Sequence, residues 1–115
     1  MVTLAHEDVL HEFAQLINLD ANELDLWLRT PESQTVGHRP GESDETFGHR
    51  SGRRIVDLLR HDQPTHFDEA DIEHMRTVID SLHQQLGQRP RGDVRDTAWR
   101  FMLLNWGHDP LRDPP

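Results

Sequence analysis

The chain has 115 residues, the size of one domain with one hydrophobic core. It has no cysteine, which excludes disulfide and thiolate chemistry, and its formal net charge of −9 argues against generic attraction to nucleic acid or anionic membranes. It has no apolar run of about 18 residues and no signal-peptide start, so we expect a cytoplasmic protein without a membrane partner. We expect a single helical domain over residues 1–115.

Two amphipathic helices are predicted near the N-terminus. The first covers residues 5–18, where apolar residues recur at helical spacing. The second begins after Asp20, which together with Glu23 forms the pattern of a capping box. It should end near Thr30, because Pro31 disfavours continuation of the helix.

A polar segment at about 31–43, rich in Pro, Gly, Ser and Glu, predicts a flexible loop. The third helix should begin between Asp44 and Ser51 and carry its apolar face to Leu59. Gly48 and Gly52 are four residues apart, so in a helix they share one face and permit the close approach of another backbone.

The fourth helix is the most regular. Asp68 and Asp71 repeat the capping pattern, apolar residues recur every three or four positions to Leu86, and Gly87 is a natural end. The third and fourth helices with their short turn predict a helix-turn-helix-like pair.

A fifth helix should begin after Asp93 as its cap and run through Trp106, with an extended tail at 108–115. Its broad apolar surface predicts burial between the other helices. No segment has the alternation of a strand. The predicted fold class is therefore all-α, a compact single domain of four to five helices.

Arginines are concentrated in the third helix. Residues 48–61 carry four arginines and one aspartate, whereas residues 62–86 carry six acids and one arginine. Guanidinium groups near a helix start suit phosphate binding, although an acidic fourth helix is a poor reader of a DNA groove. The alternative is a solvated helix start whose arginines pair with the acidic first half of the chain. The predicted nucleic-acid or anion-binding residues are Arg50, Ser51, Arg53, Arg54, Arg60, Arg89, Arg91 and Arg95.

No catalytic, cofactor or metal site is predicted. His61 and His66 flank a turn beside Asp62, but their spacing matches no standard ligand pattern. No nucleophile turn or glycine-rich phosphate loop is present. The three tryptophans lie on apolar helix faces, which favours the core over base stacking. We therefore expect a protein that is not an enzyme.

The sequence resembles a bacterial and fungal family called domain of unknown function 3140. The resemblance is carried by the stretches 51–59, 71–79 and 106–111, with further similarity at Phe13, Asn18 and residues 24–29. Some members of that family carry a DNA-binding label, which the resemblance passes on as an expectation. The predicted function is binding of DNA or another polyanion through the arginines, and the alternative is a protein–protein interaction module with no nucleic-acid role.

Overall fold

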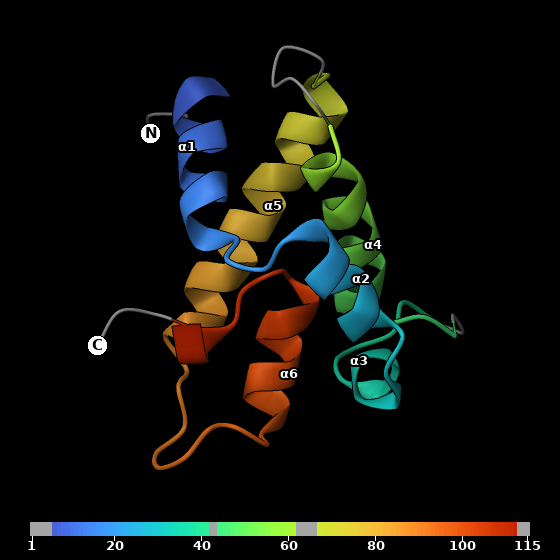
Figure 1. Cartoon of the computed structure of the whole chain (residues 1–115), viewed down its shortest axis with the longest axis vertical. Helices are drawn as coiled ribbons and strands as arrows, with labels where there is room; N and C mark the ends of the chain where they lie inside the picture. The colour runs from blue at the N-terminus through green and yellow to red at the C-terminus, as the bar shows by residue number, and fades with distance from the viewer. Residues whose placement is uncertain (1–5, 42–43, 62–66, 113–115) are drawn as a thin grey trace.

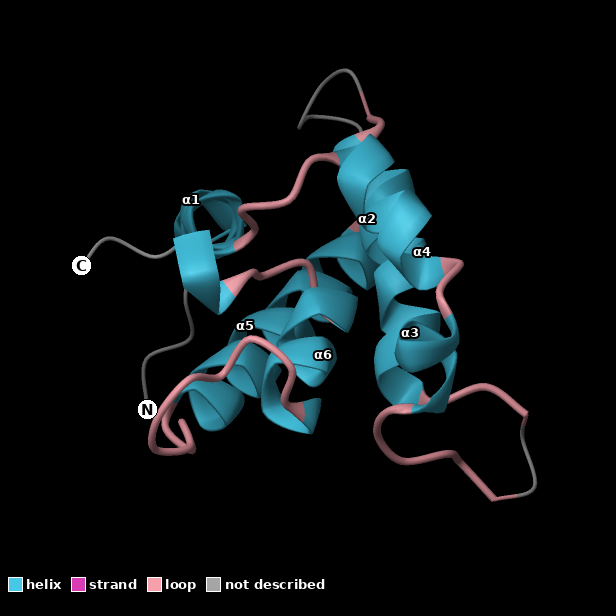
Figure 2. Cartoon of the chain, turned by 60° about the horizontal axis from the view of Figure 1, so that its bottom comes forward, coloured by secondary structure: helices cyan, strands magenta, loops and turns pink. Residues whose placement is uncertain are grey.

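The computed structural model describes residues 6–41, 44–61 and 67–112, and this part of the chain is helical, without a strand (Figures 1 and 2). The all-α prediction is confirmed. None of the described helices has the length and apolar content that a bilayer crossing requires. The elements are α1 (His6–Leu16), α2 (Ala21–Leu28), α3 (Pro31–Thr35), α4 (Phe47–Leu59), α5 (Glu69–Leu86), α6 (Ala98–Asn105) and the 3₁₀ helix η2 (Pro110–Arg112).

The helices form two packed pairs with α6 between them. α1 packs along α5, α2 packs on α4, and α6 contacts all of α2, α3, α4 and α5 (Figure 1). Leu24, Ile55, Met75, Leu82 and Leu103 are fully buried and come from four helices, so a single core joins the elements. The predicted burial of the last long helix is confirmed.

Both predicted capping boxes are present. The Glu23 backbone N–H donates to Asp20 Oδ1 at 2.8 Å, and the Asp20 N–H donates to Glu23 Oε1 at 3.0 Å. The Asp71 N–H donates to Asp68 Oδ1 at 2.9 Å, and the return bond measures 3.1 Å. These reciprocal bonds satisfy backbone donors that a helix start otherwise leaves open.

The predicted start of the last long helix at Asp93 is wrong. The Asp93 side chain accepts from the Arg95 N–H at 2.9 Å and closes a local turn instead. Thr97 is the cap: its backbone is extended and its hydroxyl accepts from the Arg100 N–H at 3.2 Å. Val94, between the two candidates, is buried in the core, so the chain folds inward before the helix begins.

The predicted loop at 31–43 begins with the short helix α3. Pro31 ends α2, as expected, but it also occupies the first position of α3, where its missing N–H costs nothing. Thr30 caps this helix, and Ser33 is fully buried with its hydroxyl 2.5 Å from Asn105 Oδ1. The polar composition of the segment therefore concealed an ordered turn of helix; residues 42–43 of the predicted loop lie outside the described residues.

The predicted extended tail is wrong where the structure describes it. Residues 107–112, which we call the C-terminal clamp, fold back onto the end of α1. Gly107 has φ +85°, and its carbonyl accepts from the N–H groups of Asn18 and Leu19 at 3.1 and 3.3 Å. The Asn18 side chain pairs with the backbone of Asp109, whose carboxylate binds the Arg100 guanidinium at two distances of 3.1 Å. Three prolines in the sequence predicted extension, but side-chain partners fix a compact turn; residues 113–115 lie outside the described part.

The glycine face of α4 sets the position of that helix. A Cβ atom added at Gly52 would lie 2.6 Å from the Asn105 carbonyl oxygen and 2.6 Å from Leu28 Cδ2. The predicted close approach is confirmed, because only a glycine leaves room for the end of α6 at this distance. With this face turned inward, the arginines of α4 lie toward solvent or toward α5.

Candidate functional site

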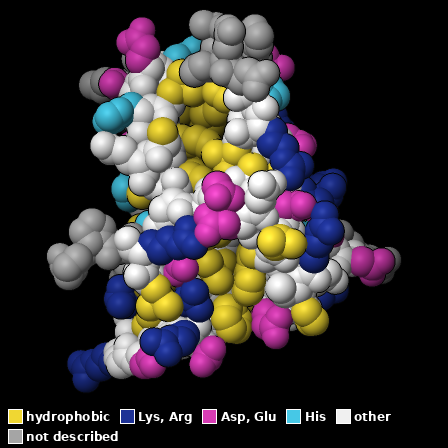
Figure 3. Space-filling model, viewed as in Figure 1, with side chains coloured by type: hydrophobic (Ala, Val, Ile, Leu, Met, Phe, Trp, Pro, Cys, Tyr) yellow, Lys and Arg dark blue, Asp and Glu magenta, His cyan; other side chains and the backbone are white. Residues whose placement is uncertain are grey.

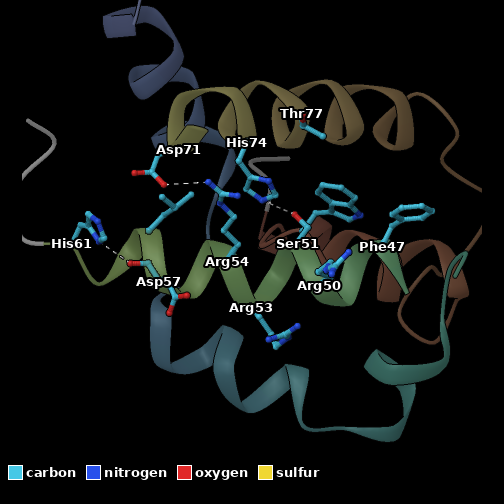
Figure 4. Close-up of a pocket in the computed structure, with 12 residues that line it drawn as sticks. Phe47, Arg50, Ser51, Arg53, Arg54, Asp57, His61, Asp71, His74 and Thr77 are labelled. Carbon is cyan, nitrogen blue, oxygen red and sulfur yellow. Dashed lines mark hydrogen bonds and ion pairs between the residues drawn. The ribbon is translucent and has the colours of Figure 1, made fainter. Parts of the chain in front are cut away.

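A groove of about 690 Å³ lies between α4 and α5 (Figure 4). Two side-chain contacts cross it: Ser51 Oγ lies 3.0 Å from His74 Nε2, and Arg54 Nη2 lies 3.4 Å from Asp71 Oδ1. Its lining combines apolar, cationic and acidic groups, namely Phe47, Arg50, Ser51, Arg53, Arg54, Asp57, Leu58, His61, Asp71, His74, Thr77 and Trp106.

Arg50 is the cation of the groove that remains open to a ligand. It is exposed, and within the described part of the chain its guanidinium forms no ion pair or hydrogen bond. It is drawn beside Phe47 at the end of α4 away from His61 (Figure 4). A guanidinium with all its donors unused can bind a phosphate or carboxylate in a bidentate manner.

Arg53 is committed to an internal partner. Its Nε and Nη2 atoms donate to the two carboxylate oxygens of Glu45 at 2.7 and 2.6 Å, and its side chain lies on the side of α4 away from α5 (Figure 4). The hydrogen bonds from Arg53, with a further one from His49, outweigh burial and lower the pKa of Glu45 to about 2. This pair matches the alternative expectation, in which arginines are neutralised by acids from the first half of the chain.

Arg54 and Arg60 are partly neutralised. Burial raises the pKa of Asp71, but hydrogen bonds from the Asp68 backbone and from Arg54 outweigh it and hold that pKa below its ordinary value. Arg60 lies 3.8 Å from Asp25 of α2. Acidic side chains are accordingly interleaved with the arginines along the edge formed by α4 and α2 (Figure 3). The predicted cluster is thus a mixed-charge surface.

Ser51 lies at the base of the groove and is nearly buried, with its hydroxyl bonded to His74. Burial lowers the pKa of His74, and the positive charge of Arg54 lowers it further. The imidazole is therefore neutral at pH 7, and the Ser51–His74 contact holds the walls of the groove together without adding charge.

The arginines of the turn after α5 do not line the groove. Arg89 lies over the Trp99 ring with its Cζ atom 5.4 Å from the ring centroid, a cation–π contact. Arg91 and Arg95 are exposed. The structure therefore brings together Arg50, Arg53 and Arg54 and leaves this second group apart, and its role in binding stays a prediction.

The sequence indicated neither Phe47 nor His74 as site residues. Helical spacing places Phe47 on the face of Ser51 and Ile55, which predicts burial, yet its side chain is 53% exposed. The capping threonine at position 46 shows where α4 starts, but only the tertiary packing shows that the core does not cover its first turn. His74 was one of nine histidines, and no local spacing links it to Ser51.

Within the described ranges, no group of three histidine or acidic side chains is placed to hold a metal ion. In the turn that His61 and His66 flank, the His61 ring stacks on Phe67 with the ring centroids 5.1 Å apart. Asp62 and His66 lie outside the described residues.

A family model described as "Protein of unknown function (DUF3140)" matches residues 12–104. The match covers most of the chain and every groove-lining residue except Trp106. No curated protein and no solved structure matches the sequence.

Proposed function

We propose, for a chain that belongs to the DUF3140 family, a non-enzymatic role in binding DNA or another polyanion through the groove between α4 and α5. One observation carries the proposal: within the described residues, the Arg50 guanidinium has no ion pair or hydrogen bond, and it lies in a groove that also holds Arg54. Three arginines and two aspartates line that groove, but Arg53 is paired with Glu45, so the positive character of the groove rests on Arg50, on a chain of net charge −9. Local charge at contact distance, more than net charge, determines where a phosphate can bind.

The charge of α5 limits the mode of binding. α5 carries four acids and one arginine, and it is the helix that a helix-turn-helix protein would insert into the major groove. Repulsion from phosphates opposes that insertion. The helix-turn-helix prediction therefore enters this proposal only as the pair of helices that flank the groove, with the phosphate contacts made by α4.

A salt series tests the proposal. Fluorescence anisotropy of a labelled DNA oligomer should show an affinity that falls as salt rises, with a logarithmic slope of about −0.7 to −0.9 for each phosphate contact. Arg50→Ala should weaken binding and reduce this slope by about one contact. Arg29→Ala is the matched control, because Arg29 is also exposed, does not line the groove and is not among the predicted binding residues. An equal loss in both variants would contradict a binding site in the groove.

A protein–protein interaction module is the second candidate, and Phe47 favours it. This large apolar side chain is exposed at a groove of mixed charge, which is also the character of a small protein-binding surface. The same titration separates the two functions: if no polyanion binds even at low salt, the interaction module replaces the first proposal.

A further inference from the structure

One end of the groove combines an exposed aromatic ring with a cation that has no side-chain partner among the residues that the structure describes. Phe47 and Arg50 are three residues apart in α4, so they lie on neighbouring parts of one helix face (Figure 4). Both line the groove, as does the partly exposed ring of Trp106. Aromatic rings beside cations in a groove are the arrangement on which unpaired bases stack while phosphates are neutralised.

The Phe47 side chain is half exposed and is not part of the hydrophobic core. Thr46 caps the helix, and the tie to the preceding segment is a backbone bond from the Phe47 N–H to the His38 carbonyl at 2.8 Å. Single exposed apolar side chains are common on soluble proteins, and Leu26 and Leu111 are further examples here. Phe47 differs from these two because it lies in the groove beside an arginine with free donors.

We infer that the groove recognises single-stranded nucleic acid in preference to a duplex, with an unpaired base against Phe47 and its phosphate on Arg50. The inference rests on the proposed function. The volume of the groove is within the range of about 300–1,000 Å³ that holds small ligands. The groove therefore suits individual nucleotides better than the width of a double helix. A duplex also keeps its bases stacked internally and brings a denser line of phosphates toward the acids of α5.

Three probes test this inference: a short oligothymidine, a duplex of the same length, and inorganic polyphosphate, which has the backbone charge but no bases. Anisotropy, with polyphosphate as a competitor, should give tighter binding of the single strand than of the duplex. Phe47→Ala should weaken binding of the single strand by about tenfold and leave the affinity for polyphosphate unchanged. Phe47→Leu, which keeps an apolar side chain but removes the ring, should show a similar loss.

Leu26→Ala is the matched control, because Leu26 is a 65% exposed apolar residue that does not line the groove. Its binding to all three probes should equal that of the wild type. Equal affinity for the single strand and the duplex would overturn the inference, and so would an unchanged affinity of Phe47→Ala for the single strand. If polyphosphate still binds in either case, the proposed function stands. Absence of binding to every probe at low salt would overturn both.

Discussion

Replacing Gly52 by alanine tests the contact that positions α4. The added Cβ would lie 2.6 Å from Leu28 Cδ2 and 2.6 Å from the carbonyl oxygen of Asn105. The leucine side chain can turn away, but the carbonyl belongs to the backbone at the end of α6 and cannot move alone. The substitution therefore forces α4 and α6 apart.

Two opposing effects set the magnitude. Alanine is better than glycine inside a helix by about 1 kcal/mol. Overpacking a core costs typically about 1–3 kcal/mol, and a contact with rigid backbone belongs at the upper end of that range. We therefore expect a net loss of about 1–2 kcal/mol in the free energy of unfolding, which lowers Tm by roughly 5–10 °C for a domain near this size.

Thermal unfolding followed by far-UV circular dichroism measures this effect. Gly87→Ala is the matched control: Gly87 has φ −69°, and its added Cβ would meet atoms no closer than 3.5 Å, an ordinary contact. The control should have a Tm equal to or above that of the wild type. A Gly52→Ala protein as stable as the wild type would refute the close approach of α4 and α6.

Three further predictions concern buried or paired polar groups. Asn105→Leu should lower the free energy of unfolding by about 2–5 kcal/mol, measured by urea unfolding. The Trp27 indole N–H, which is 2.7 Å from Asn105 Oδ1, loses its acceptor, and so does a buried serine hydroxyl. A change below about 1 kcal/mol would contradict this role. Glu45→Gln should be less stable than the wild type at pH 7, because Arg53 lowers the pKa of Glu45 to about 2 in the folded state. The difference in stability should shrink as pH falls from about 4.5 toward about 2. A pH-independent difference would exclude this linkage. The pKa of His74, measured by NMR titration, should lie below its ordinary value of 6.5, because burial disfavours the charged imidazole. Protonation of His74 therefore destabilises the folded state as pH falls below 6.5. A measured pKa at or above 6.5 would show that the burial of His74 is not maintained.

Local signals in the sequence were sufficient for most helix boundaries. The capping boxes at Asp20 and Asp68 predicted two helix starts, because their hydrogen bonds form between residues three apart. The spacing of Gly48 and Gly52 predicted a face of close packing, because residues four apart lie on the same side of a helix. At the start of α6, however, Asp93 and Thr97 are both acceptable caps, and the burial of Val94 decides between them.

The charge pattern of the site could not be predicted from the sequence. The acids that pair with Arg53, Arg54 and Arg60 lie eight, 17 and 35 residues away, and no helical spacing relates them. A charge count by segments therefore overestimated how many arginines are open to a ligand. Which arginine is open depends on where α2, α5 and the segment before α4 place their carboxylates around α4, and that is a property of the packed fold.

The C-terminal clamp also determines the order in which the chain can fold during synthesis. Asn18, which follows α1, exchanges two hydrogen bonds with the backbone of Asp109, 91 residues later. The ribosome must therefore release almost the whole sequence before α1 can acquire these partners. The apolar residues Val9 and Phe13 do not depend on this step, because α1 packs along α5, which ends at Leu86. Closure of the clamp on the end of α1 is thus among the last steps of folding, and a nascent chain that stalls before residue 109 lacks these two hydrogen bonds.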